Sequence, residues 1–335
     1  MQGQMTYTGH VRAILTLGLP LIGGHLGQVA IGVTDTVMLG WYSVEALAAV
    51  TLASTYFFVL FIFGSGFAWA VMPMVASFAA EKDETGIRRA TRMGLWLSLG
   101  FGLVSLPFLV FSEPILRLLG QGEAVAVAAG RYLAVAGWGI LPALLVMVLK
   151  SYLAALERTQ VVLWITLVAA LVNALANYAF IFGNWGAPEL GIVGAAFASV
   201  TTQVVSLIGV VLYIVLVVPQ HQLFVRIWRA DRQMLARVFR LGVPIGLTAL
   251  SEVGLFAASA MMMGWLGTIT LAAHGIALQL ASITFMVHLG LSNVATIRAG
   301  NAFGRRDPAH MARGAVTVTV LSVAFAAVTI FGFVM

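Results

Sequence analysis

Two acidic residues lie inside long apolar segments of this chain, where a carboxylate is costly. Asp35 is flanked by Thr34 and Thr36, and Glu252 lies in an apolar run with Ser251 before it. A charge at the middle of a membrane helix costs about 2.5–3.5 kcal/mol on insertion scales, so such a residue normally faces a cavity or a partner. Asp35 and Glu252 are therefore candidates to bind a proton or a Na⁺ ion.

Amides accompany these carboxylates at helical spacing. Gln28 lies seven residues before Asp35, nearly two turns, so the two share a helix face. Asn173 and Asn177 lie four residues apart and share another face. Such amides often only join helices through hydrogen bonds, and the spacing leaves this role and a polar site equally open. His25, close to the Gln28 face, is expected to bond to a neighbouring helix.

Two prolines fall inside the segments that carry the carboxylates. Pro20 and Pro244 each remove a backbone hydrogen bond and permit a bend in the helix. Membrane helices also tolerate proline without any functional reason. A bend next to a titratable carboxylate is the functional interpretation of both positions.

Composition places these residues in a membrane. Hydrophobic residues make up 61% and charged residues 9% of the 335 residues, against about 25% charged in ordinary globular domains. Runs of about 20 apolar residues span a bilayer. Nine spans are predicted near 14–40, 46–77, 92–112, 126–152, 159–182, 191–218, 236–263, 270–300 and 314–335. We expect an all-α, multi-pass membrane protein.

Missing residues and motifs exclude several function classes. The chain has no cysteine, which excludes disulfides and thiolate metal sites. It also has no His-Glu-x-x-His motif, no Gly-x-Ser-x-Gly motif and no phosphate-binding glycine loop with lysine. We therefore expect no enzyme and no cofactor. An ion gradient then supplies the energy, at about 2.3 kcal/mol per charge across 100 mV.

The cations are unevenly distributed along the chain. Of the 18 Lys and Arg residues, all but Arg117 and Arg131 lie at the start or in even-numbered connections. Because cytoplasmic loops carry the excess of Lys and Arg, the N-terminus is predicted to be cytoplasmic. The net charge of +6 is then a topology signal, and we expect no binding to nucleic acid.

One pair of spans is repeated 224 residues later, with twelve identities over 37 positions. Leu17, Gly18, Pro20, Leu26, Val29, Met38, Gly40, Trp41, Leu47, Ala48, Ala49 and Ala53 recur as Leu241, Gly242, Pro244, Leu250, Val253, Met262, Gly264, Trp265, Leu271, Ala272, Ala273 and Ala277. Such repeats are typical of transporters built from two similar bundles. Six spans separate the copies, so the bundles are predicted to be parallel. The most polar positions of the repeat differ between the copies: Asp35 aligns with Ser259, and Gln28 aligns with Glu252.

The repeat also predicts the organisation of the chain. Residues 1–218 are predicted to form a six-helix bundle, and 219–235 a basic amphipathic connector. Its composition suits a helix on the cytoplasmic surface and is also compatible with an ordinary linker between the bundles. Residues 236–335 are predicted to be the first three helices of a second bundle, which is incomplete. We therefore expect a truncated sequence or a fragment. A short amphipathic helix is expected over 113–125 on the outer face.

An ordered set of short segments resembles the multidrug and toxic compound extrusion (MATE) family, and most closely its bacterial NorM-type branch. The segments are Leu17–Pro20, Val33–Gly40, Met72–Ala76, Val172–Asn177, Leu271–Leu278 and Gly300–Asp307. Each segment is loose on its own, but their order is specific, and the resemblance covers essentially the whole chain.

The resemblance implies a twelve-helix antiporter that exports organic cations in exchange for protons or sodium. It implies that Asp35 is the first-helix coupling carboxylate and Glu252 the seventh-helix acid of this branch. Asn173 and Asn177, with Gln28, would form the polar network around Asp35. Pro20 would be the bend point of the first helix, and the acidic residue of the family's tenth helix lies beyond this sequence.

These expectations combine into one function. The chain is expected to be a secondary active multidrug efflux antiporter of a bacterial inner membrane, working by alternating access between two bundles. Small organic cations and membrane lipid are the expected partners, and a monomer is expected. One alternative is a lipid-linked oligosaccharide flippase of the same wider fold. It would need a strongly cationic central cavity, whereas the embedded charges are expected to be negative. A membrane-embedded enzyme is the second alternative, and the missing motifs disfavour it.

Overall fold

A computed structural model describes residues 5–334, apart from the side chains at 261, 264, 265, 268, 271, 272 and 334. Within this part of the chain the regular elements are all helices, and nine helical stretches are long and apolar enough to cross a membrane. The all-α prediction and the span count are confirmed. The repeated residues Gly264, Trp265, Leu271 and Ala272 lie outside the described side chains.

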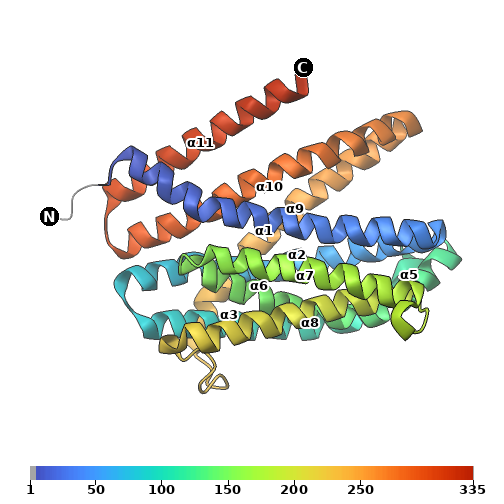
Figure 1. The fold of residues 1–335 in the computed structure, drawn as a ribbon, viewed down its shortest axis with the longest axis horizontal. Helices are drawn as coiled ribbons and strands as arrows, with labels where there is room; N and C mark the ends of the chain where they lie inside the picture. The colour runs from blue at the N-terminus through green and yellow to red at the C-terminus, as the bar shows by residue number, and fades with distance from the viewer. Residues whose placement is uncertain (1–4, 335) are drawn as a thin grey trace.

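The helices follow the predicted spans but extend beyond most of them (Figure 1). The spanning helices are α1 (Tyr7–Tyr42), α2 (Val44–Glu81), α3 (Glu84–Val110), α7 (Thr159–Phe182), α8 (Ile192–Val217), α9 (Arg232–Trp265), α10 (Thr268–Gly304) and α11 (Pro308–Val334). The remaining span joins α5 (Glu123–Ala136), a 3₁₀ turn (Gly137–Gly139) and α6 (Ile140–Ala155). A short helix α4 (Ser112–Leu118) forms part of the segment expected to be helical on the outer face.

Capping side chains begin the first two helices. The hydroxyl of Thr6 accepts from the amide of Gly9 at 3.2 Å. Ser43 alone separates α1 from α2, and its hydroxyl accepts from the amide of Ala46 at 3.3 Å. Such caps satisfy amides that have no partner within the helix, and each stabilises by about 1 kcal/mol. A single residue between two spanning helices forces them to run antiparallel.

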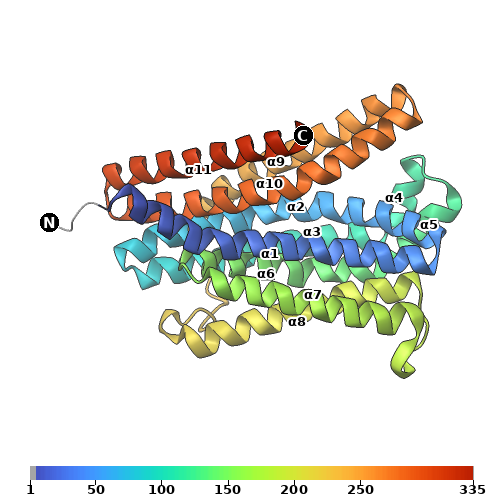
Figure 2. The same cartoon turned by 45° about the horizontal axis from the view of Figure 1, so that its top comes forward.

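The last three helices lie along the first two. α1 packs against α7, and α2 against α6 and α3. α9 and α10 both pack on α2, while α10 and α11 also contact α1 (Figures 1 and 2). The boundary between the two predicted bundles stays a prediction.

Glycines bring α2 close to α9 and α10 in the halves predicted to be cytoplasmic. A Cβ on Gly66 of α2 would lie 2.6 Å from the backbone nitrogen of Gly246, and one on Gly300 of α10 would lie 2.8 Å from the carbonyl oxygen of Pro73. The other halves of α9 and α10 diverge from α1 and α2 in both views (Figures 1 and 2). Their exposed apolar side chains include Leu255, Phe256, Ile276 and Leu280. The helices thus lie close together in the halves predicted to be cytoplasmic and apart in the opposite halves.

Gly66→Ala is expected to loosen the contact between α2 and α9. Its methyl group would clash with the backbone of α9, where nothing can move aside as a side chain would. Overpacking of this kind costs about 1–3 kcal/mol. Gly100→Ala is the matched control, because nothing lies within 4 Å of its Cβ position. Thermal unfolding in detergent should show a lower melting temperature for Gly66→Ala alone; equal values for the two variants would contradict this packing.

The connector is not the surface helix that its composition suggested. After a 3₁₀ turn (Pro219–His221) the chain runs through turns until α9 begins at Arg232. Arg92 of α3 donates to the carbonyl oxygens of Gln222 at 2.7 Å and Leu223 at 2.6 Å. Trp96 of α3 donates through Nε1 to a further connector carbonyl at 2.8 Å. These long side chains supply the donors that a helix would otherwise supply from its own backbone.

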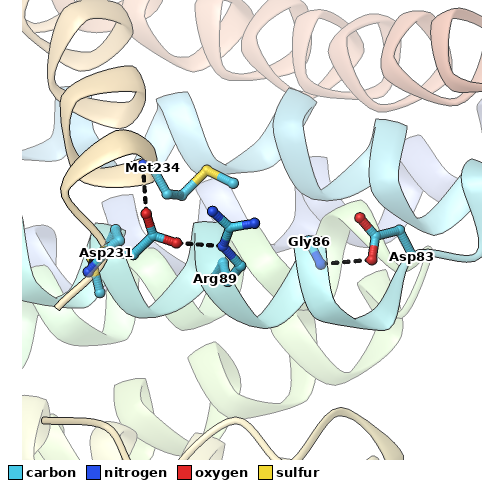
Figure 3. Close-up of polar contacts among 6 residues, drawn as sticks. Asp83, Gly86, Arg89, Asp231 and Met234 are labelled. Atoms are coloured by element: carbon cyan, nitrogen blue, oxygen red, sulfur yellow. Dashed lines mark hydrogen bonds and ion pairs between the residues drawn. The ribbon is translucent and has the colours of Figure 1, made fainter. Parts of the chain in front are cut away.

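Asp231 ends the connector and joins two helices (Figure 3). Its Oδ2 forms an ion pair with Nε of Arg89 on α3, and its Oδ1 accepts from the amide of Met234 at 3.0 Å. The hydrogen bond from Arg89 lowers the pKa of the Asp231 carboxyl below its ordinary value. One carboxylate therefore caps α9 and attaches its first turn to α3.

Substitutions at Asp231 should separate these two roles. Asn still caps a helix, so Asp231→Asn removes mainly the partly exposed ion pair, at a cost below about 1 kcal/mol. Asp231→Ala removes the cap as well and should cost about 1–2 kcal/mol.

The pH dependence of Asp231→Asn follows from the lowered pKa. A carboxyl with a lowered folded-state pKa stabilises the fold above its ordinary pKa of 3.8 and loses this effect as the pH falls through the folded value. The melting temperatures of wild type and Asp231→Asn should therefore differ at pH 7, and the difference should shrink as the pH falls below 3.8. A difference that stays the same from pH 7 to well below pH 3.8 would contradict the ion pair as its cause.

Candidate functional site

Asp35 lies against the two amides of α7. Asn177 donates through Nδ2 to Oδ1 of Asp35 at 2.5 Å and to Oδ1 of Asn173 at 3.2 Å. Asn173 and Asn177 are 1% and 0% exposed, and Asp35 is half-buried. The four-residue spacing on α7 places both amides on the face that meets α1. The structure thus brings together three of the predicted site residues.

The same cluster contains polar atoms without a protein partner. Among the residues that the structure describes, Nδ2 of Asn173 and Oδ1 of Asn177 are buried and have no hydrogen-bond partner. Buried polar atoms are rarely left unpaired, so each such atom needs an explanation. An amide oxygen beside a carboxylate has lone pairs that can accept a hydrogen bond from a protonated group or coordinate a Na⁺ ion. The oxygen atoms at this point suit either coupling ion.

A cavity of about 450 Å³ extends from this cluster through the interior of the first helices. Asp35, Gln28 and Asn173 line it, together with apolar and aromatic side chains of α2 such as Phe57 and Trp69. The lining also contains Tyr132 of α5, whose hydroxyl lies 3.4 Å from the hydroxyl of Ser199 on α8. Mostly apolar walls with a few convergent polar groups are typical of small-molecule sites.

The end of the cavity that is predicted to be cytoplasmic carries a cation. Lys150 of α6 lines it and donates through Nζ to the hydroxyl of Thr166 on α7 at 2.8 Å. His25 of α1 lies in the same lining and contacts Asn293 of α10, with 3.0 Å between Nε2 and Nδ2. The expected bond between His25 and a neighbouring helix is confirmed. The expectation that the embedded charges are all negative is wrong, because Lys150 lines the cavity.

Three residues of the cavity lining are not predicted as site residues from the sequence: Lys150, Tyr132 and Ser199. Lys150 falls inside the predicted span 126–152 but was counted with the cytoplasmic cations; its place in an apolar run was the signal. Tyr132 and Ser199 carry no such signal, since tyrosine and serine are common in membrane helices. Only the packing of α5 against α8 brings them to the cavity.

Glu252 lies apart from this site. It is exposed on α9 and does not belong to the described lining of the cavity, so the structure does not bring it to Asp35. A shared Na⁺ site of both carboxylates is therefore not formed in this conformation. Pro20 and Pro244 lie inside the continuous helices α1 and α9, and their roles as bend points stay predictions.

Comparisons with known proteins agree on one family. A family model described as MatE matches residues 20–179 and 244–335. A "Probable multidrug resistance protein NorM" of Rhizobium meliloti is 47% identical over 98% of this chain and 70% of its own length. The protein of the same description from Agrobacterium fabrum is 45% identical over 96% of this chain and 69% of its own length.

The fold comparison gives the same result. A solved structure described as the "Outward-facing conformation of a multidrug resistance MATE family transporter of the MOP superfamily" superposes with a TM-score of 0.81. Its sequence is 21% identical, and the match covers 96% of this chain and 71% of that one. At this identity the likeness shows a shared fold.

Proposed function

This chain belongs to the MatE family, and from that premise we propose that it is a multidrug efflux antiporter that exports organic cations in exchange for H⁺ or Na⁺. It is a multi-pass membrane protein and a transporter rather than an enzyme. A bacterial inner membrane, a cytoplasmic N-terminus and a monomeric state are parts of the proposal.

The observation that carries the proposal is the position of Asp35. Its carboxylate lies where a mostly apolar cavity meets two buried amides, one of which has an unpaired oxygen. A cationic drug and a coupling ion would both be attracted to this carboxylate. Because both bind the same group, binding of the ion from outside releases the drug. This competition is the simplest way in which one site couples two opposite movements.

The arrangement of the helices supports alternating access. Glycine contacts close the halves of α2, α9 and α10 that are predicted to be cytoplasmic, while the opposite halves of α9 and α10 expose apolar side chains. We propose that closure on the outer side accompanies opening on the cytoplasmic side, with the close contact at Gly66 giving way.

Glu252 takes a separate part in this scheme. Its position on the exposed face of α9 keeps it from the cavity in the present conformation. We propose that Glu252 receives its ion in another step of the cycle, when the outer half of α9 approaches α1. A carboxylate in an apolar span is otherwise a cost without a function.

Dye efflux from proteoliposomes tests the function directly. Vesicles loaded with a fluorescent organic cation are given an inward pH gradient or an inward sodium gradient in separate samples. One of the two gradients should accelerate dye efflux, and its collapse with an ionophore should stop the acceleration. Efflux that neither gradient changes would contradict the proposal.

The flippase alternative has gained one observation. Lys150 adds a cation to the cavity lining, whereas the charge pattern of the sequence assigns this residue to a cytoplasmic connection. A single lysine facing a carboxylate in the same cavity is still far from the cationic surface that a pyrophosphate needs. The efflux proposal therefore keeps its place.

A further inference from the structure

A second cluster of titratable side chains joins three helices at the end of the bundle that is predicted to be cytoplasmic. One guanidinium nitrogen of Arg298, on α10, lies 2.7 Å from Nδ1 of His10 on α1 and 3.2 Å from Nε2 of His310 on α11. The two imidazole rings contact each other, with 4.6 Å between their centroids. Figures 1 and 2 show the beginnings of α1 and α11 beside the end of α10. None of the three residues belongs to the described lining of the cavity.

The geometry of this cluster requires both rings to be neutral. An arginine only donates hydrogen bonds, so Nδ1 of His10 and Nε2 of His310 must each accept with a lone pair. A proton at either nitrogen would remove that lone pair and place a second positive charge within hydrogen-bond distance of the guanidinium. His10 is fully buried and Arg298 is 8% exposed, so water screens this repulsion poorly.

The charged groups around the cluster do not offset the repulsion. Among the described residues, no carboxylate forms an ion pair with Arg298. The nearby charged groups are Arg305 after α10, Arg313 on α11, Asp307 before α11 and Glu157 before α7. The Asp307 carboxylate caps α11 by accepting from the amide of His310 at 2.9 Å. The Glu157 carboxylate accepts from Asn301 at 2.9 Å. Two cations thus balance two acids that already have partners.

We propose that this cluster is a proton-sensitive lock, which holds α1 against α10 and α11 at the cytoplasmic end while His10 is neutral. When α1 moves away, His10 leaves Arg298 and is free to bind a proton near the ordinary pKa of an imidazole, about 6.5. Because the proton binds the separated state better, it shifts the equilibrium toward opening at this end. An acidic cytoplasm would then hold the transporter open there and delay its return. This inference rests on the proposed function and adds a regulation to it.

A purely structural role for the cluster makes a different prediction. If the three side chains only joined the helices, the loss of one of them would weaken the closed state by the same factor at every pH. A lock instead responds to pH. Its response should disappear when His10 is replaced by glutamine, which accepts from Arg298 but does not titrate.

The distance between two spin labels tests the lock. The chain has no cysteine, so labels attach only at Glu84→Cys on α3 and Ala312→Cys on α11, two exposed positions. In lipid nanodiscs without substrate, the ratio of long to short distances should rise about 10-fold per pH unit below about pH 6.5, because one proton is bound. His10→Gln should reduce this change to less than about 2-fold. His221→Gln is the matched control, since that histidine contacts Tyr152 in the connector region and should leave the response as in wild type.

Arg298→Gln provides a second variant in case His10→Gln does not fold. Without the guanidinium charge, His10 binds a proton in both states more equally, so the pH response should again be lost. A wild-type response in either variant, or constant distances in wild type between about pH 8 and about pH 5.5, would overturn the inference. The proposed function fails separately, if vesicles with wild type show no gradient-driven dye efflux, because the distances are measured without dye or gradient.

Discussion

Asp35→Asn is expected to abolish ion-driven efflux, reducing the gradient-dependent rate by about 100-fold or more. The substitution keeps the size of the side chain and a hydrogen-bonding oxygen for Asn177, so the packing of α1 on α7 should survive. It removes the only negative charge in the described lining of the cavity. A charge-assisted hydrogen bond contributes roughly twice as much as a neutral one, so both the organic cation and the coupling ion lose their main attraction.

The measurement is dye efflux from vesicles under an imposed gradient, with equal amounts of protein. Glu45→Gln is the matched control, because Glu45 is a carboxylate near the outer end of α2 and lies outside the described cavity lining. This control should transport as wild type does. Wild-type efflux by Asp35→Asn would remove the carboxylate from the mechanism.

Glu252→Gln is expected to separate binding from transport. Because Glu252 lies outside the described lining of the cavity, dye affinity should stay within about 2-fold of wild type. Efflux should nevertheless fall by about 10-fold or more, since a carboxylate that costs about 2.5–3.5 kcal/mol to embed is expected to act in the cycle.

Anisotropy titrations and vesicle efflux on the same preparation check this pair of outcomes. Ser251→Ala, at the adjacent exposed position of α9, is the control and should retain both properties. Unchanged efflux in Glu252→Gln would show that the acid is dispensable. A parallel loss of dye affinity would place it in the binding site, against the geometry described.

Hydropathy predicted the helices well and their ends less well. The first span was expected over 14–40, whereas α1 runs from Tyr7 to Tyr42. Hydropathy marks only the part of a helix in the apolar layer, while caps such as Thr6 and Ser43 set its ends. The prediction of a helix in the connector was wrong for another reason. The backbone carbonyls of the connector accept hydrogen bonds from Arg92 and Trp96, which lie more than 100 residues earlier in the chain.

The features of the site that depend on spacing within a single helix were predictable from the sequence. Spacing placed Asn173 and Asn177 on one face, and the resemblance assigned that face to Asp35; the hydrogen bond from Asn177 to Asp35 agrees with this assignment. Which helices enclose the cavity is a matter of long-range packing, and so Lys150 was placed with the surface cations. The repeat predicted where Glu252 lies in the chain, but not how far the outer half of α9 stands from α1.

Counter-movement of ions tests the central claim most directly. The organic cation is added outside vesicles that contain the wild-type chain, and no ion gradient is imposed. An indicator follows the movement of H⁺ or Na⁺ across the vesicle membrane. If exchange occurs at Asp35, inward dye movement should drive one of these ions outward, and Asp35→Asn should stop both movements together. Dye that crosses without any ion movement, or ion movement that persists in Asp35→Asn, would contradict exchange at Asp35.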